Sequence, residues 1–555
     1  MSNTRPYTIA SLLLAGAVTL YLCFFIATNR YSLPLVFLWA LAILLVLTAG
    51  IPSRIPKMTF PQLTKKRLFI LAIMFLPIVV RVLLYQPDRI HGDDLLTATF
   101  SQNYHPLTTN FFSGIPPGDA WVAKFPTPYF LFQKLFLSMT GASVLTVKLS
   151  VLPYIFVVTV CTYLIARTLF GRIAGIAAVI LYAFMAISIY HETLGLHFIS
   201  STAVYMLFFV SLLRLQKRYT RFRLVTTGIT AGLCYLSYPS SYIALPILLV
   251  AVIHALFARK AHPVRIITWI TIGVIVVLAP FVTYALTQEN YFAGRIQQVS
   301  LINGTWSVYK TAGHTVSETG KVIWDNTVLS LSSFVKDGVG GHGGYTFHQQ
   351  AFFPPVGLLF FLWGTAFLFI RMSRHIAIWL IMLTVVLTYI TGMVLTIPPP
   401  AYHRLTLAFP FIAVISASPF ALLTLKKRVP FFIAMVALAI YAGINIHYVQ
   451  TATKEEAMIE DAAIIHHVNA YYPGRSIYVA AFPSFALGYF FPFFPQTTAP
   501  GITTKYHQDF LRSKIPGRYV IILTLPGEFK QDFTDTYPEA TYIPFSDKYG
   551  IMINL

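Results

Sequence analysis

Residues 68–94 read LFILAIMFLPIVVRVLLYQPDRIHGDD, a hydrophobic run that ends in the motif His91-Gly92-Asp93-Asp94. A helix that crosses a bilayer needs about 20 apolar residues, and this run is close to that length. Two adjacent carboxylates beside a bilayer are costly to hold there and rarely serve packing. A carboxylate pair at the membrane boundary suits acid–base chemistry on a polar group that a lipid delivers. The stretch therefore indicates an enzyme that works at a membrane surface.

The composition places the whole chain in a membrane. Its 555 residues are 56% hydrophobic and only 11% charged, whereas a soluble protein carries roughly a quarter charged residues. We therefore predict a polytopic α-helical membrane protein. The net charge of +21 does not indicate nucleic-acid binding, because the basic residues form short clusters between apolar segments, as cytoplasmic loops do.

Hydropathy predicts about thirteen transmembrane helices. They cover residues 7–27, 32–50, 68–87, 144–166, 173–189, 198–214, 224–239, 241–258, 266–287, 353–370, 375–397, 405–425 and 430–449. The first is read as a retained helix and not as a cleaved signal peptide, because another apolar segment follows it at once. The seventh and eighth are short and separated only by Pro239-Ser240, so this pair has the weakest signal.

The basic clusters predict the orientation. Counting the spans places every cluster on the side of the N-terminus: residues 54–67, 167–172, 214–223, 259–265, 371–374 and 426–428. The positive-inside rule then puts the N-terminus in the cytoplasm and the C-terminus outside the cell (inner) membrane. The acid pair lies outside too, where nucleotide sugars and ATP are not supplied. An enzyme there must draw its activated substrate from a lipid.

Three parts of the chain are expected. Residues 1–67 hold two N-terminal helices and a basic cytoplasmic loop. Residues 68–449 form the transmembrane catalytic region, with outer loops at 88–143, 190–197, 288–352 and 398–404. Residues 450–555 form a small extracytoplasmic α/β accessory domain, because a charged helical pattern at 452–471 precedes strand patterns at 476–481, 519–525 and 549–554.

Three carboxylates are candidates for catalysis. Asp93 and Asp94 fit a general base and a partner that tunes or orients it, since a hydroxyl is a poor nucleophile until its proton is removed. A helix N-cap or a solvated loop pair is the structural alternative. Glu192 is the only carboxylate of the second outer loop. It is either a further acidic group that faces the pair or a solvated loop residue.

Cations at the outer boundary suit a lipid-linked phosphate, which arginine can clamp with two hydrogen bonds. The candidates are Lys124, Arg295 and Arg404. Snorkelling to lipid headgroups is the alternative for each. Arg81, inside the third segment near its outer end, is expected to pair with an acidic neighbour in a structural or a functional role.

No cofactor or metal is expected. All three cysteines lie inside apolar stretches, which leaves no disulfide framework and no thiolate metal site: Cys23, Cys161 and Cys234. A metal held by His191, Asp94 and His197 is an alternative that we do not favour.

Several motifs together resemble the GT-C glycosyltransferases of family 39. The resemblance is strongest to bacterial relatives of the dolichyl-phosphate-mannose protein mannosyltransferases and to the aminoarabinose lipid A transferase. The motifs are His91-Gly92-Asp93-Asp94, Lys124-Phe125-Pro126, Gly141, Lys148, residues 167–171, the stretch AGLCYLSYPS at 231–240, and Tyr402-His403-Arg404. They span roughly residues 68–425.

The resemblance implies a GT-C fold with a catalytic acidic pair on the first outer loop, here Asp93 and Asp94. Many members have Asp-Glu, so Asp-Asp is an accepted variation, and it leaves open which of the two is the base. Lys124 matches a lysine that contacts the lipid phosphate in aminoarabinose transferases, although Phe-Pro-Thr-Pro follows it here in place of consecutive prolines. His403 joins Arg404 in the implied phosphate site. Inversion at the anomeric carbon and no obligatory metal are also implied.

The predicted function is a hexosyl- or pentosyltransferase of the cell envelope. It would move a sugar from a polyprenyl-phosphate donor to a hydroxyl of a lipid, glycan or protein, with Asp93 as general base. One alternative is a lipid-linked sugar transporter or flippase, which should carry internal repeats and charges near the midplane. The other is a cell-envelope protein similar to O-antigen ligases, with its chemistry on a long loop and no acidic pair in the first.

Overall fold

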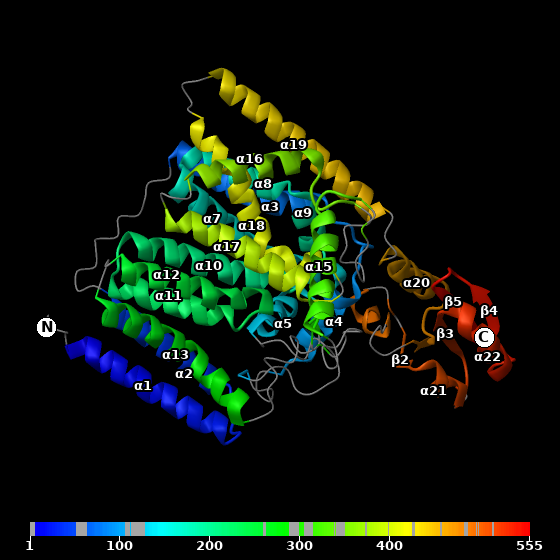
Figure 1. Cartoon of the computed structure of the whole chain (residues 1–555). Helices are drawn as coiled ribbons and strands as arrows, with labels where there is room; N and C mark the ends of the chain where they lie inside the picture. Colours follow the sequence, from blue (N-terminus) through cyan, green and yellow to red (C-terminus); the bar gives the residue numbers. More distant parts are fainter. Residues whose placement is uncertain are drawn as a thin grey trace.

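The computed structural model describes most of the chain, and the described part is mostly helical (Figure 1). The described residues are 6–51, 64–105, 111–112, 128–258, 262–287, 299–302, 304, 315–337, 339, 350–371, 375–397, 399–423, 428–454, 458–481, 487–494, 497, 499–512 and 515–554.

A helix is present at each of the thirteen predicted segments. In the first half these are α1 (Pro6–Ala27), α2 (Pro34–Gly50), α3 (Lys65–Leu83), α6 (Val144–Leu149) with α7 (Leu152–Phe170), α8 (Arg172–Ala183) with α9 (Ala186–Glu192), α10 (Phe198–Lys217) and α11 (Arg221–Cys234). In the second half they are η2 (Pro239–Ile243) with α12 (Ala244–Phe257), α13 (Pro263–Thr287), α16 (Pro355–Arg371), α17 (Ile376–Tyr389) with η4 (Ile390–Val394), η5 (Tyr402–Ala408) with α18 (Phe409–Ala417) and η6 (Ser418–Leu422), and α19 (Arg428–Lys454).

Not all of these helices are long enough to count as spans on their own. Among the described residues, eight are long and apolar enough to cross a membrane, or nine if α8 and α9, bent by 57°, are one broken span. The protein is therefore a multi-pass membrane protein, as the composition predicts. The count of thirteen spans stays a prediction, because helices such as α2 and α16 have only 17 residues each.

Small residues let neighbouring helices approach closely. Gly228 of α11 faces the Ile270 carbonyl of α13 with no room for a Cβ, and Gly273 of α13 faces the Val225 carbonyl at 2.5 Å from where its Cβ would lie. Without a hydrophobic driving force between helices in lipid, such close backbone packing is a main source of association. It fixes α11 against α13, on the side of the bundle where α1 and α2 lie (Figure 1).

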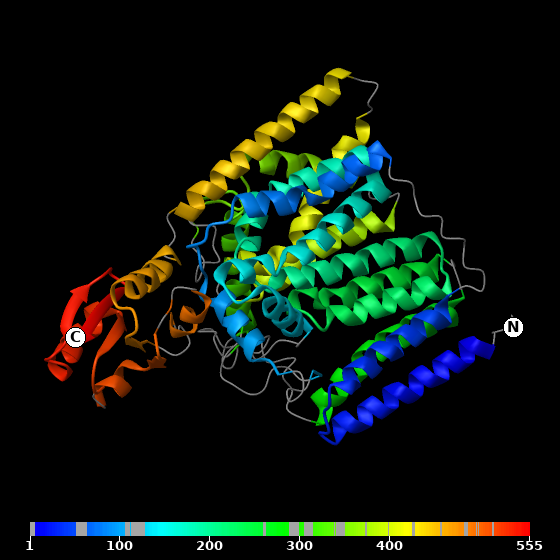
Figure 2. The ribbon, with the colours of Figure 1, turned by 180° about the vertical axis from the view of Figure 1, so that it is seen from behind.

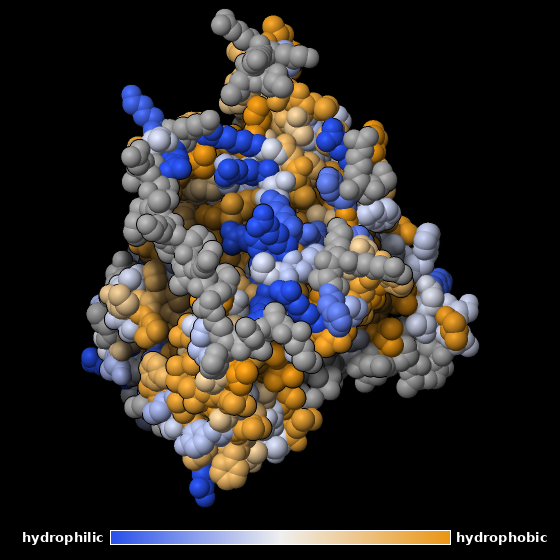
Figure 3. Space-filling view, turned by 90° about the vertical axis from the view of Figure 1, so that its left-hand side faces the viewer, coloured by the Kyte–Doolittle hydropathy of each residue, from blue (hydrophilic) through white to orange (hydrophobic). Residues whose placement is uncertain are grey.

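The two ends of the bundle differ. The N-terminus lies at one end and the C-terminal sheet beyond the other, in both the front and the rear view (Figures 1 and 2). Figure 3 looks at the N-terminal end, where hydrophilic side chains gather across the middle between apolar surfaces. At the opposite end, three helices lie outside the spanning bundle: α4 (Gly92–Asn103), α5 (Pro128–Thr140) and α15 (Val316–Ser332).

The C-terminal part is a small α/β unit, as predicted. It begins with α20 (Met458–Tyr471), and the three predicted strands are present as β1 (Ser476–Ala480), β3 (Tyr519–Thr524) and β5 (Tyr549–Asn554). Two strands were not predicted, β2 (Ile502–Lys505) and β4 (Thr541–Pro544). The sheet order is β2-β1-β3-β5-β4, with β1 parallel to β2 and β3, and β5 antiparallel to β3 and β4. Helices α21 (His507–Arg512) and α22 (Pro526–Thr536) complete the unit.

This C-terminal unit packs against the helix that carries the acid pair. Ile90 and Leu95 share one buried cluster with Ile465 of α20 and with Phe490. The Phe490 ring lies 3.5 Å from where a Cβ on Gly92 would stand. The contact therefore holds the start of α4 from the side opposite the transmembrane bundle.

Candidate active site

The acid pair forms the first turn of α4. His91 is the N-cap, and its Nδ1 accepts a hydrogen bond of 3.0 Å from the Asp93 backbone N–H. The Asp94 carboxylate accepts one of 3.3 Å from the His91 backbone N–H, which completes a capping box. Carboxylates are favourable here because they meet unpaired N–H groups and the positive end of the helix dipole. The structural alternative for Asp94, a helix cap, is thus present in the fold, and it leaves the Asp93 carboxylate outside the cap.

The two carboxylates occupy different environments. Asp94 is fully buried, and its Oδ1 has no hydrogen-bond partner among the described residues. Burial raises the pKa of the Asp94 carboxyl to about 6, against the opposing effects of Lys148 and His91. The Asp93 side chain is 24% exposed, and its Oδ2 lies 4.0 Å from His91 Nδ1. Neighbouring carboxylates with such different surroundings can take different protonation roles.

Lys148 supplies the positive charge that faces Asp94. It lies on α6, only 5% exposed, and its Nζ donates hydrogen bonds to the carbonyls of Gln86, at 3.2 Å, and Arg89. These carbonyls belong to the loop that leads into α4, so the lysine also ties that loop to the bundle. In the sequence, Lys148 is one of the residues of the family resemblance and was given no role in the site, although a lone cation within the apolar segment 144–166 is itself a signal of function.

Arg89 joins the same loop to the second outer segment. It is 2% exposed and donates hydrogen bonds of 2.9 Å to the Tyr190 carbonyl and of 2.9 Å to Thr193 Oγ1. Its guanidinium also lies 4.0 Å from the centre of the Tyr190 ring. Sequence reasoning missed this residue, because its partners lie about a hundred positions away along the chain.

Glu192 is a buried ion-pair partner. Its Oε2 lies 2.9 Å from Arg81 Nε, while its Oε1 accepts hydrogen bonds from Tyr182, at 2.7 Å, and Ser188, at 2.8 Å. Reading Glu192 as a solvated loop residue was therefore wrong, and the predicted acidic partner of Arg81 is present. Arg81 also donates to the carbonyls of Tyr182 and Ala183, so the pair holds the bend between α8 and α9.

A small cavity connects this ion pair with Lys148. It measures about 40 Å³, and its polar lining comes from Arg81, Tyr85, Lys148, Glu192 and Thr193. Glu192 therefore lies on the same internal surface as the lysine that faces Asp94. A catalytic role for Glu192 stays a prediction. In the structure, the Glu192 carboxylate forms an ion pair with Arg81.

His403 and Arg404 lie on η5, and both are about 6% exposed. Arg404 Nη2 donates a hydrogen bond of 2.8 Å to the Ile397 carbonyl. The His403 ring packs 5.0 Å from the Phe198 ring, and His197 packs 4.4 Å from the same ring and 5.8 Å from Tyr129 of α5. A chain of aromatic contacts thus connects η5 with the first outer loop.

Two predicted phosphate-binding residues, Lys124 and Arg295, lie outside the described residues. A metal site on His191, Asp94 and His197 is not supported, because the described residues contain no group of three or more histidine, cysteine or acidic side chains that could hold a metal ion. Of the cysteines, Cys161 and Cys234 are buried and Cys23 is half-buried.

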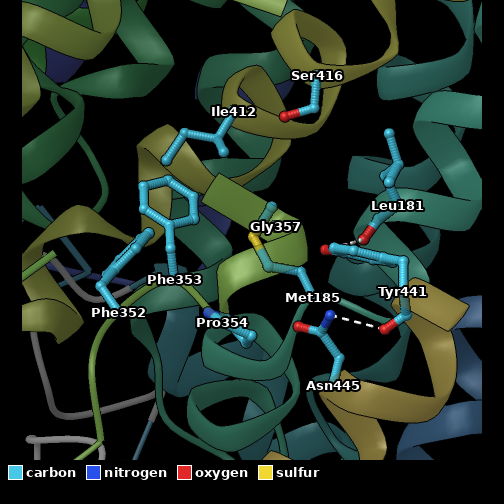
Figure 4. Close-up of a pocket in the computed structure, with 10 residues that line it drawn as sticks. All are labelled: Leu181, Met185, Phe352, Phe353, Pro354, Gly357, Ile412, Ser416, Tyr441 and Asn445. Carbon is cyan, nitrogen blue, oxygen red and sulfur yellow. Dashed lines mark hydrogen bonds between the residues drawn. The ribbon is translucent and has the colours of Figure 1, made fainter. Parts of the chain in front are cut away.

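A second cavity, of about 10 Å³, lies beside the bend between α8 and α9 (Figure 4). It has room for about one water molecule. Two of its polar groups make internal hydrogen bonds: Asn445 Oδ1 accepts from the Ala186 N–H at 2.9 Å, and the Tyr441 hydroxyl donates to the Leu181 carbonyl at 3.1 Å. Its volume and these bonds mark it as part of the packing around the bend and not as a substrate site.

Comparison with known proteins establishes the fold class. No family model and no curated protein matches this sequence. Solved structures do match, and they assign the chain the GT-C fold that the sequence resemblance implied. One is ArnT from Cupriavidus metallidurans bound to undecaprenyl phosphate, with a TM-score of 0.60 and 11% identity over 88% of this chain and 98% of that one. The apo state of the same ArnT matches with a TM-score of 0.58 and 10% identity, over 89% of this chain and 99% of that one.

Proposed function

We propose that this protein is a membrane glycosyltransferase that moves a sugar from a polyprenyl-phosphate donor to a hydroxyl acceptor on the extracytoplasmic face. The observation that carries the proposal is the acid pair at the start of α4, with Asp94 buried beside Lys148 and Asp93 partly exposed. It is set in a GT-C fold at the end of the bundle that carries the outer helices. The acceptor is a lipid, a glycan or a protein.

Asp93 is assigned as the general base. Its carboxylate takes the proton of the acceptor hydroxyl while the acceptor oxygen forms a bond to the anomeric carbon. The bond from that carbon to the phosphate oxygen breaks, and its electron pair leaves with the polyprenyl phosphate. Above a pH of about 6 the neighbouring Asp94 is an anion, so the pair then presents negative charge to the proton of the acceptor hydroxyl.

The donor phosphate is assigned to the cations at the outer boundary. Arg404 and His403 are the described members, and Lys124 and Arg295 complete the proposed set. A guanidinium can bind two phosphate oxygens at once and stabilise the charge that develops as the phosphate leaves. The undecaprenyl phosphate bound to the structurally similar ArnT supports a polyprenyl phosphate as the partner.

The proposed arrangement of the chain follows the positive-inside rule. The N-terminus is assigned to the cytoplasm, and residues 450–555 to an accessory domain outside the cell (inner) membrane. Packing of Phe490 against Gly92 supports a positioning role for that domain at the start of α4. The proposed reaction requires no cofactor.

A transfer assay on the purified protein in sealed proteoliposomes tests this function. Radiolabelled sugars are offered on polyprenyl phosphate and, separately, on nucleoside diphosphates, with a mixture of envelope lipids and glycans as acceptors. Label should pass only from the polyprenyl-phosphate donors. Transfer from nucleotide sugars, or accumulation of intact donor in the opposite leaflet without transfer, would replace the proposal by a cytoplasmic-type transferase or by a flippase.

A further inference from the structure

Helix α15 (Val316–Ser332) lies across the ends of the spanning helices instead of along them (Figure 1). One of its faces is fastened to the end of the span formed by α17 and η4. Asn326 donates a hydrogen bond of 3.1 Å to the Val394 carbonyl, and Ser330 donates one of 3.4 Å to the Met393 carbonyl. Because Val394 is the last residue of that span, these bonds place α15 at the depth where the span meets the membrane boundary.

A second face of α15 is apolar and exposed. Trp324, Val328 and Leu331 follow one another at intervals of four and three residues, so they share one side of the helix. They are 65%, 47% and 51% exposed. An exposed tryptophan with aliphatic neighbours is typical of segments at the membrane–water interface, because the indole ring has an apolar body and a polar N–H.

A third face carries charges. Glu318, Lys321 and Asp325 are all exposed and are spaced by three and four residues. At 100° per residue, this charged face lies beside the apolar face and not opposite to it. A helix half-sunk in an interface has this arrangement, with one side toward protein, one toward lipid and one toward water.

We propose that α15 lies in the outer interface of the bilayer and that lipid acyl chains cover its apolar face. A neighbouring surface supports lipid as the occupant. Trp379, Val386 and Ile390 form an exposed apolar stripe along α17 and η4, and this stripe leads up to the bonds that hold α15. The apolar face of α15 continues the lipid-facing surface of an adjacent span.

The position of α15 matters for the cations of the proposed site, a point that rests on the proposed function. At its end, the Ser333 carbonyl accepts a hydrogen bond of 2.9 Å from the Tyr402 hydroxyl. Tyr402 is the first residue of η5, the helix that carries His403 and Arg404. A lipid-embedded α15 therefore holds these cations near the level of lipid headgroups.

Spin-label accessibility tests the depth of α15 without any need for transfer activity. Cys23 is replaced by alanine, and the buried Cys161 and Cys234 stay in place. Val328→Cys and Leu331→Cys are labelled in nanodiscs of phosphatidylcholine and phosphatidylglycerol, with Asp325→Cys on the charged face as the matched control. We expect the labels at 328 and 331 to collide more often with oxygen than with a water-soluble nickel chelate, and the label at 325 to show the reverse.

Two results would overturn the proposal. Preference for the nickel chelate at both 328 and 331 would place the apolar face in water. Broadening of the spectra by a second label, removed by dilution with unlabelled protein, would make a second copy of this chain the occupant. Neither result depends on whether the protein transfers sugar, so a failure here is distinct from a failure of the proposed function.

Discussion

Replacement of Lys148 by methionine should move the pH dependence of sugar transfer. The substitution keeps most of the side-chain volume and removes the ammonium that faces the buried Asp94 carboxylate. Nearby opposite charge favours the ionised form of a carboxyl group, and its loss favours the protonated form. Since Asp94 already has a pKa of about 6 because of burial, a larger fraction of it should be protonated at pH 7 in the variant.

The expected size follows from the usual effect of a close opposite charge, which lowers a carboxyl pKa by about 1 to 3 units. Without Lys148, the pKa of Asp94 should rise from about 6 to about 7 to 9. The ionised fraction at pH 7 would fall from about 90% to between about 50% and 1% by the titration equation. Transfer at pH 7 should then fall by about 2- to 100-fold and recover as the pH is raised.

The assay is the initial rate of transfer between pH 5 and pH 9 at saturating donor. Lys148→Arg keeps the charge, so the fall of the transfer rate toward acidic pH (the acidic limb of the pH profile) should occur at nearly the same pH as in the unmodified protein. Lys134→Met is the matched control, because Lys134 binds the Gln102 carbonyl at the other end of α4, and its loss should not shift the limb. An acidic limb at the same pH in Lys148→Met would refute the reasoning, and so would an activity loss that does not recover at high pH.

Three further predictions concern the rest of the site. Arg404→Lys keeps the charge but not the two-pronged geometry, so transfer should fall partway, and Arg404→Ala should fall further, mainly when donor concentration is varied. Full activity of Arg404→Ala at low donor would show that this arginine only anchors η5. Removing one partner of the buried ion pair, as in Arg81→Met or Glu192→Gln, should lower the free energy of unfolding by about 3 to 5 kcal/mol. The double variant Arg81→Met/Glu192→Met should recover much of that loss, as measured by thermal unfolding. A loss in the double variant equal to the sum of the losses in the two single variants would contradict this prediction. Asp94→Asn should be more resistant to heat than the unmodified protein at pH 8 but not at pH 4. The reason is that folding raises the pKa of Asp94 from 3.8 to about 6. The unmodified protein therefore loses free energy of unfolding as the pH rises through 6 and the buried Asp94 ionises, by about 3 kcal/mol at 1.36 kcal/mol per pKa unit. Asparagine cannot ionise and avoids this loss. If Asp94→Asn and the unmodified protein had the same thermal midpoint at pH 8 as well as at pH 4, this prediction would be wrong.

Much of the fold could be predicted from hydropathy, because a spanning helix must satisfy its own backbone hydrogen bonds with a continuous apolar run. The strands β1, β3 and β5 could also be predicted from a local apolar pattern, since each is a short apolar run between turn residues. The edge strands β2 and β4 were not. Each has four residues and is at most half-buried, so its sequence carries little of the strand pattern.

The site was predictable only where its signal is local. The capping pattern at His91 to Asp94 depends on four consecutive residues, and the acid pair could be singled out from them. The environment of that pair depends on contacts far apart in sequence, such as Phe490 against Gly92. The pairing of Glu192 with Arg81 spans 111 positions, and no local pattern distinguishes a buried partner of this kind from a solvated loop residue.

The central claim is that Asp93 is the general base of a lipid-linked sugar transfer. The most direct test is the single-turnover rate of transfer from a polyprenyl-phosphate sugar by Asp93→Asn. Asp88→Asn is its matched control, because Asp88 is an exposed carboxylate five residues earlier whose 3.2 Å ion pair with His466 is also exposed, and exposed pairs contribute little to stability. We predict a fall of about 100-fold or more for Asp93→Asn, the usual contribution of a general base, and little change for Asp88→Asn. Equal single-turnover rates in the two variants would contradict the account.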